Sequence, residues 1–155
     1  MIPRYTHPDM GRIWGDQRKY DTWLRVEVAA AEAMAAAGLI PAEAARAIAA
    51  CDGVRAERVD ELEQTTQHDV IAFTTAVAER VGPSARWLHF GLTSSDVLDT
   101  ALALHGLEQD RGGFGRDGPF GRIDIVERHL IEAVGLGAEP LEIFRLSAGG
   151  DGGQR

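Results

Sequence analysis

The side chains with the clearest chemical potential are three consecutive hydroxyls, Thr93, Ser94 and Ser95, which stand directly before a predicted helix. The first N–H groups of a helix have no internal partner and lie at the positive end of its dipole. Hydroxyls presented beside these N–H groups can bind a phosphate or a carboxylate. Thr93 and Asp96 also have the spacing of a capping box, so an ordinary capped helix start is the alternative explanation.

A second polar segment, Gln67-His68-Asp69, precedes another predicted helix. Histidine titrates near neutral pH, and a neighbouring carboxylate can orient its ring or raise its pKa, which suits general acid–base catalysis. The pattern therefore predicts a catalytic or ligand-binding His68. Asp69 also suits the positive end of a helix dipole, which is the structural alternative.

Two further groups fit an anionic ligand. His89 follows Trp87 and Leu88, so it is either a functional histidine or a half-buried aromatic side chain of the core. Arg4 and Tyr5 place a cation beside a phenol, a combination that can hold a phosphate, although N-terminal arms are often simply solvated. Together with the two helix starts, these residues predict a site for an anion.

The composition is that of a soluble globular protein, with 45% hydrophobic and 26% charged residues among 155. A net charge of −8 argues against nucleic acid or an anionic membrane surface as the main partner. No apolar run approaches the length of a membrane span, and residues 1–5 lack the apolar core of a signal peptide. Cys51 is the only cysteine, which excludes an internal disulfide and a multi-cysteine metal site. We therefore expect a cytoplasmic protein.

Hydrophobic spacing predicts an all-α fold for residues 1–105, because apolar positions recur every three or four residues. Pro3 and Pro8 predict an irregular start through residue 13. Helices are expected over residues 16–37, 41–51, 54–64 and 70–81 and from Ser95 onward, with an interruption at 65–69 and a short turn capped by Ser84. The apolar stripe of the first helix comprises Tyr20, Trp23, Leu24, Val28, Ala31, Met34 and Ala35. That of the last comprises Val97, Leu98, Ala101, Leu102 and His105.

These motifs together resemble the amino-terminal part of adenylosuccinate lyase, a family of the fumarase/aspartase superfamily. The resemblance is carried by residues 2–5, by Thr22-Trp23-Leu24 with Glu27, by residues 68–70 and by the run from Arg86 to Thr100. It implies an all-α homotetramer built around long central helices, with each active site formed by segments of three subunits. Members release fumarate from adenylosuccinate to give AMP, and from the succinylated carboxamide ribotide of purine biosynthesis. They need neither a metal nor an organic cofactor.

The resemblance also implies a role for each candidate residue. The substrate-binding residues would be Arg4, Tyr5, Gln67, His68, Asp69, Thr93 and Ser94. The N-terminal arm would contact the nucleotide, the His-Asp segment would line the substrate, and the hydroxyl segment would hold the dicarboxylate end. His68 would assist catalysis, and His89 would be an active-site neighbour with no assigned role.

Elimination of fumarate also needs a base, an acid and groups that stabilise negative charge. The family places its principal catalytic histidine in a later Gly-Arg-Thr-His-Gly-like segment, and its base serine in a Gly-Ser-Ser-x-Met-Pro-x-Lys-x-Asn-like loop. Neither segment occurs in this sequence. We therefore expect a fragment that is inactive alone, with apolar stripes left exposed and prone to aggregation. The alternatives are a catalytically silent helical module that binds substrate or a partner, and another lyase of the superfamily, which Arg4-Tyr5 disfavours.

The composition changes at about residue 106, where the resemblance also ends. Of the 18 glycines, 12 follow residue 105. A glycine inside a helix costs about 1 kcal/mol relative to alanine, so the last helix should not continue far past Gly106. We expect residues 106–155 to form a poorly ordered tail unrelated to the family, with a short helix over 122–134 and an apolar segment over 140–146. A frameshift after codon 105 would explain the change, and reading the gene in its other frames tests this hypothesis.

Overall fold

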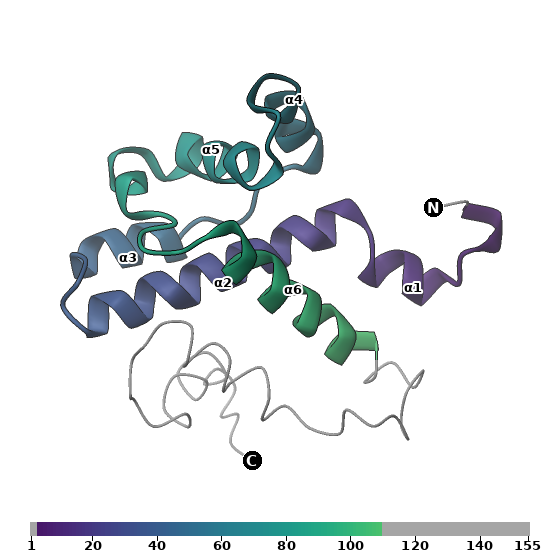
Figure 1. Ribbon diagram of the computed structural model, residues 1–155, viewed down its shortest axis with the longest axis horizontal. Coiled ribbons are helices and arrows are strands. Elements are labelled where there is room, and N and C mark those ends of the chain that lie inside the picture. Colours follow the sequence, from purple (N-terminus) through teal and green to yellow (C-terminus); the bar gives the residue numbers. More distant parts are fainter. Residues whose placement is uncertain (1–2, 110–155) are drawn as a thin grey trace, which may run out of the picture.

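The computed structural model describes residues 3–109, which contain helices and loops but no strand (Figure 1). The all-α prediction is therefore confirmed for this part of the chain. The elements in chain order are η1 (Pro3–Tyr5), α1 (Pro8–Ile13), α2 (Asp16–Ala36), α3 (Ala42–Ala49), α4 (Ala56–Thr66), α5 (Asp69–Val81), η2 (Gly82–Trp87) and α6 (Ser94–Gln109).

Helix α2 is the element on which the others pack. It runs lengthwise through the molecule, with α3 alongside its C-terminal half, α4 and α5 on one side, and α6 crossing it (Figure 1). The stripe from Tyr20 to Met34 is buried as its spacing predicts, whereas Val28 and Ala35 are only half-buried. The helix ends where Gly38 adopts a left-handed φ of 73°, a conformation that favours glycine.

Three aromatic rings form the centre of the main core. Tyr20 and Trp23 of α2 meet Phe73 of α5, with ring centroids 5.4 Å apart for Tyr20–Trp23, 5.4 Å for Trp23–Phe73 and 6.1 Å for Tyr20–Phe73. All three side chains are at most 3% exposed. The same core includes Val59 of α4 and Val97 of α6. It therefore joins α2, α4, α5 and α6 into one body that carries the starts of both α5 and α6.

The predicted irregular start of the chain is wrong. Residues 3–5 form the 3-10 helix η1, and Pro8 begins the α-helix α1 instead of preventing it. The first N–H of a helix needs no internal partner, and the fixed φ of proline suits this position. The imidazole of His7 caps α1, since Nδ1 accepts a hydrogen bond from the Asp9 N–H at 3.4 Å.

Three smaller expectations also need correction. Helix α4 extends past its predicted end at residue 64 and reaches Thr66. It ends there because the next residue, Gln67, adopts a left-handed φ of 51°. Ser84 does not start the turn before residue 87, since η2 begins at Gly82 with Pro83 in its first turn. Leu102 is 59% exposed because it lies 100° around α6 from Ala101, on whose face the helix packs.

Helix α6 continues through Gly106 to Gln109, the last described residue. The expectations for the tail, including the short helix over 122–134 and the apolar segment over 140–146, lie outside the described residues. The predicted division of the chain into a family-related part, residues 1–105, and an unrelated tail, residues 106–155, stays a prediction. Between residues 3 and 109, no helix is both long and apolar enough to cross a membrane.

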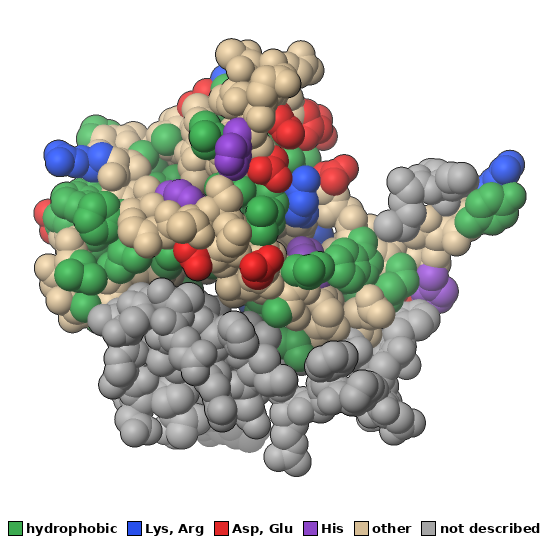
Figure 2. Space-filling view, viewed as in Figure 1, with side chains coloured by type: hydrophobic (Ala, Val, Ile, Leu, Met, Phe, Trp, Pro, Cys, Tyr) green, Lys and Arg blue, Asp and Glu red, His purple; other side chains and the backbone are tan. Residues whose placement is uncertain are grey.

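The expectation that the apolar stripes stay exposed is wrong for the described residues, because the stripes are largely buried against one another; large apolar side chains do remain on the surface, but only Leu102 among them belongs to a predicted stripe. Figure 2 shows hydrophobic side chains spread over the viewed face between acidic groups. Among the described residues, those that are more than a third exposed are Tyr5, Trp14, Leu39, Ile71, Phe90 and Leu102. Whether they cause aggregation stays a prediction.

Candidate functional site

The hydroxyl segment does begin a helix. Helix α6 starts at Ser94, and the Asp96 carboxylate accepts the Thr93 N–H at 2.7 Å, as in a capping box. The Thr93 hydroxyl donates to the same carboxylate oxygen at 2.9 Å instead of capping a helix N–H. Within the described part of the chain, the hydroxyls of Ser94 and Ser95 make no hydrogen bond. Ser94 is half-buried and Ser95 exposed, so both hydroxyls are free to meet a ligand.

Removing the Asp96 carboxylate tests this cap. Asp96→Ala is expected to lower the free energy of unfolding by about 1 kcal/mol, because the first turn of α6 loses the acceptor that fixes Thr93. Urea unfolding followed by circular dichroism measures the loss. Asp99→Ala is the matched control, since Asp99 is an exposed carboxylate of the same helix with no hydrogen bond among residues 3–109. An equal loss in both variants would contradict the cap.

His68 stands at the start of α5 and caps it. Its Nδ1 accepts the Ile71 N–H at 3.4 Å, while Oδ1 of Asp69 lies 3.5 Å from the same nitrogen. A nitrogen that accepts carries no proton, so this arrangement assigns the proton of the neutral ring to Nε2. The side chain is 42% exposed, and its Nε2 edge has no partner within the described chain. His68 therefore combines a structural role with an Nε2–H that is free to meet a ligand.

The two neighbours of His68 are engaged locally. The Gln67 amide donates to the carbonyl of Gln64 at 3.0 Å and closes the end of α4. The Asp69 carboxylate accepts its neighbour's N–H, that of Val70, at 2.7 Å. Both side chains are at least partly exposed, but neither is aimed at a ligand by these contacts.

His89 lies in a left-handed turn and is bound to a buried carboxylate. Its φ is 57°, its Nδ1 lies 2.6 Å from Oε1 of Glu27, and its backbone N–H donates to Oε2 of Glu27 at 2.9 Å. The hydrogen bond to Glu27 raises the pKa of His89, and the charges of Glu27 and Asp96 act in the same direction against the effect of burial. His89 is thus held by a specific partner, and it is more than a half-buried aromatic residue.

Sequence reasoning missed Glu27 as a functional residue and used it only as part of the resemblance. The side chain is 1% exposed on α2. The signal was present: Glu27 falls on the same helical face as Trp23 and Ala31, four residues from each, in a stripe that is otherwise apolar. A carboxylate at such a position needs a buried partner.

Arg4 and Tyr5 stand apart from the helix starts in this chain. The Arg4 guanidinium lies 4.7 Å from the centre of the Tyr5 ring, and Tyr5 is 74% exposed. Figure 1 places η1 beyond α1, at the opposite end from η2 and away from the start of α6. A single chain therefore does not bring the arm and the hydroxyl segment into one cleft.

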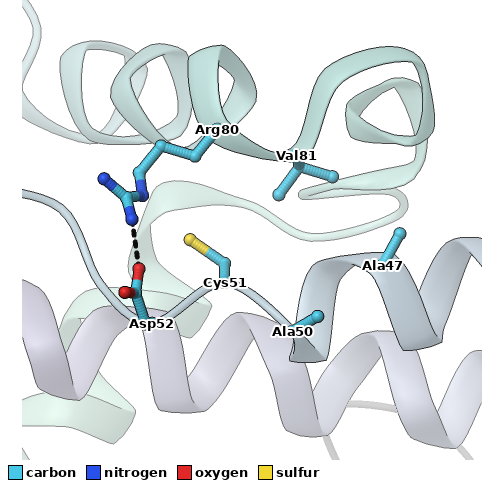
Figure 3. A pocket seen from close by; sticks show the side chains of 6 residues that line it. All are labelled: Ala47, Ala50, Cys51, Asp52, Arg80 and Val81. Atoms are coloured by element: carbon cyan, nitrogen blue, oxygen red, sulfur yellow. Dashed lines mark hydrogen bonds and ion pairs between the residues drawn. The ribbon is translucent and has the colours of Figure 1, made fainter.

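Two open pockets lie elsewhere. One of about 540 Å³ lies between the ends of α3 and α5, with Cys51 and the Arg80–Asp52 ion pair in its wall (Figure 3). The other, of about 510 Å³, lies beside α1 and includes Trp14 and Asp16. Neither is lined by a residue predicted for the site. Among residues 3–109, no group of three or more His, Cys, Asp or Glu side chains could hold a metal ion.

His105 is buried at the junction of α1, α2 and α6. It is 4% exposed and stacks on Trp14, with ring centroids 5.4 Å apart, and neither ring nitrogen makes a hydrogen bond with the described residues. Burial lowers the pKa of His105. The charged groups that face it are Glu108 on its own helix and Arg18 and Arg25 on α2, and the Ile13 backbone faces it from α1.

His105 predicts a loss of stability in acid. Because the folded chain binds this proton less tightly than the unfolded chain, the free energy of unfolding falls as pH drops below the ordinary value of 6.5. His105→Phe keeps a ring against Trp14 and removes the titration. Its gain in stability is expected to be larger at about pH 5 than at about pH 8 in urea unfolding. A gain that is the same at both pH values would contradict the assignment.

The comparisons with known proteins decide the family. Residues 4–110 match the model of a protein family described as lyases. The chain belongs to this lyase family. It is 56% identical over 104 residues to an adenylosuccinate lyase of Synechocystis sp., and 48% identical over 103 residues to that of Staphylococcus saprophyticus. The alignments cover 67% and 66% of this chain but 24% of each relative, so the chain spans about a quarter of the length of these lyases.

Membership of the lyase family confirms the resemblance that the motifs indicated. All the candidate site residues, from Arg4 to Ser94, lie inside the matched range, which ends beside the last described residue of α6. The individual roles of these residues in a lyase stay predictions.

Proposed function

We propose that this chain supplies the amino-terminal part of a carbon–nitrogen lyase that releases fumarate from adenylosuccinate to give AMP. The same activity would act on the succinylated carboxamide ribotide of purine biosynthesis. The observation that carries the proposal is the 56% identity over 104 residues to a protein named adenylosuccinate lyase. The substrate would be an anionic nucleotide, and neither a metal nor an organic cofactor would be required.

The geometry of the helix starts supports this proposal. The reaction removes a proton from the carbon beside a carboxylate, breaks the carbon–nitrogen bond and leaves a proton on the departing nitrogen. Ser94 offers a free hydroxyl at the positive end of α6, which suits a carboxylate of the succinyl group. His68 offers a free Nε2–H at the start of α5, a helix that packs in the same core, which suits proton transfer or a hydrogen bond to the reacting end.

The separation of the arm from the helix starts supports a shared site. Arg4 and Tyr5 would contact the nucleotide of a site whose remaining residues belong to other subunits, in a homotetramer. Trp14, Ile71 and Leu102 are exposed apolar side chains that such an assembly would cover. We also propose a cytoplasmic location and no nucleic-acid or membrane partner, in keeping with the net charge of −8.

A graft tests the lyase activity directly. Residues 3–105 replace the aligned segment of the Synechocystis adenylosuccinate lyase, and proton nuclear magnetic resonance (NMR) follows fumarate and AMP. The grafted enzyme is expected to cleave adenylosuccinate with a kcat within about tenfold of the parent, because more than half of the aligned residues are identical, 56% over 104 residues. A graft that folds and assembles like its parent but releases no fumarate would contradict the proposal and support a silent helical module.

The unmodified chain provides a second measurement. We propose that it releases no fumarate on its own, since the family's later histidine and serine segments do not occur in its sequence. Turnover by the purified chain would overturn this inactivity while supporting the lyase assignment.

A further inference from the structure

Glu27 is the most deeply buried carboxylate among the described residues, and the proposed reaction gives it no role. It is 1% exposed in the middle of α2. Both of its oxygens are used by one residue, His89, which lies 62 positions later in the chain. No lysine or arginine pairs with it among residues 3–109. Burying a charge without a partner is costly, so His89 is what makes this glutamate tolerable in the core.

The pairing fixes which edge of the His89 ring faces outward. Oε1 of Glu27 accepts from Nδ1, so the Nδ1 position carries a proton and Nε2 is turned away from the carboxylate. The His89 side chain is 24% exposed, and Nε2 has no partner among the described residues. Asp96, in the first turn of α6, is close enough to act on the charge of the ring. The His89 ring therefore lies near the start of α6.

The pairing also fixes the backbone that leads into α6. A left-handed φ at a residue other than glycine costs about 1 kcal/mol, and the bond from the His89 N–H to Oε2 of Glu27 offsets this cost. The Leu92 N–H returns to the His89 carbonyl at 3.3 Å, and Gly91 adopts a φ of 73° between them. The turn delivers the chain to Thr93, immediately before Ser94.

We propose that Glu27 is a positioning residue of the lyase site: it holds the His89 ring with Nε2 aimed outward and, through the turn at residues 89–92, places the start of α6. The inference rests on the proposed function for its effect on substrate, but the state of His89 can be measured without substrate. Glu27 itself touches no ligand, and its effect passes entirely through His89 and the turn.

The first experiment measures His89 in the full chain by nitrogen-15 NMR. In the wild type, Nδ1 is expected to be protonated, and the pKa of His89 to lie above its ordinary value because of the Glu27 carboxylate. Glu27→Gln removes that charge and is expected to lower the pKa of His89 and to shift the amide signals of Thr93 and Ser94. Glu32→Gln, an exposed carboxylate of the same helix, is expected to change neither.

The second experiment measures binding of adenylosuccinate to the grafted enzyme with and without the same substitutions, because the proposed site is completed by other subunits. Glu27→Gln is expected to weaken binding about tenfold near neutral pH, the order of one charge-assisted hydrogen bond. The unsubstituted graft should lose affinity for adenylosuccinate as pH rises through the raised pKa of His89. Two carboxylates act on this ring, Glu27 from α2 and Asp96 from α6. Glu27→Asp keeps the charge and is expected to restore part of both effects.

The outcomes separate the two proposals. If the unsubstituted graft binds no adenylosuccinate, the proposed contribution to the substrate site fails, while NMR of the unaltered chain still decides whether Glu27 positions His89. A wild-type His89 whose Nδ1 is unprotonated, or whose pKa is not raised, overturns the positioning role. This test does not depend on whether Glu27→Gln folds, because the state of His89 is measured in the unaltered chain. The positioning role is also overturned if the unsubstituted graft binds adenylosuccinate and a folded Glu27→Gln graft binds it with the same affinity.

Discussion

Replacing His68 with alanine in the grafted enzyme is expected to lower kcat about a hundredfold or more, with a much smaller change in KM. Positioned acid–base groups contribute on the order of a hundred- to ten-thousandfold to reactions that move protons. His68 meets the geometric requirement, since its Nδ1 is occupied by the Ile71 N–H while its Nε2 edge is exposed and unpaired within the described chain. Initial rates of fumarate release over a range of adenylosuccinate concentrations measure both constants.

His68→Asn separates this catalytic role from the structural one. Asparagine is a good helix cap, so the variant should preserve the start of α5 while removing the imidazole. His68→Asn is expected to lose as much kcat as His68→Ala but less stability. His7→Asn is the matched control, because His7 also caps a helix through Nδ1 but has no proposed role in the site. An asparagine variant of His68 with the kcat of the unsubstituted graft would show that His68 serves only as a cap.

The features that sequence reasoning predicted well are those determined locally. The long apolar stripe of α2 and the Thr93-x-x-Asp96 pattern each depend on residues within a few turns of one another, and both form as expected. Errors at helix ends have local causes too, since Pro8 begins a helix that it was expected to prevent. Such boundaries depend on one or two backbone angles, to which hydrophobic periodicity is insensitive.

The features that sequence reasoning missed depend on contacts between distant segments. Glu27 and His89 are 62 residues apart, and nothing in the spacing of either predicts the other. Similarly, the residue types of Arg4-Tyr5 and Ser94 suggested a common anion site. Their separation in space follows from the direction in which α1 and η1 extend from the start of α2. Only the resemblance provides an expectation here: it implies that segments of different subunits meet at each active site.

His89 and His105 show how the same residue type acquires opposite behaviour from its surroundings. The Glu27 carboxylate raises the pKa of His89, so this pair contributes most to stability below pH 6.5, and its contribution is lost as pH rises through the raised pKa. Burial lowers the pKa of His105, and the resulting loss of stability appears in acid. His89 lies in the turn that leads into α6, and His105 lies on α6 itself. The packing of this helix is therefore expected to be the most sensitive to pH.

Phe73→Ala is expected to cause the largest loss of stability among single core substitutions considered for this chain. The ring is fully buried and contacts both Tyr20 and Trp23, so its removal leaves a cavity where α2 and α5 meet. Comparable truncations lower the free energy of unfolding by about 3–5 kcal/mol, which urea unfolding of the full chain would measure. Ile71→Ala is the matched control: this side chain of the same helix is 51% exposed and should cost less than about 1 kcal/mol. If both variants lost similar stability, the aromatic cluster would not be the centre of the core, and the common body assigned to the starts of α5 and α6 would lose its support.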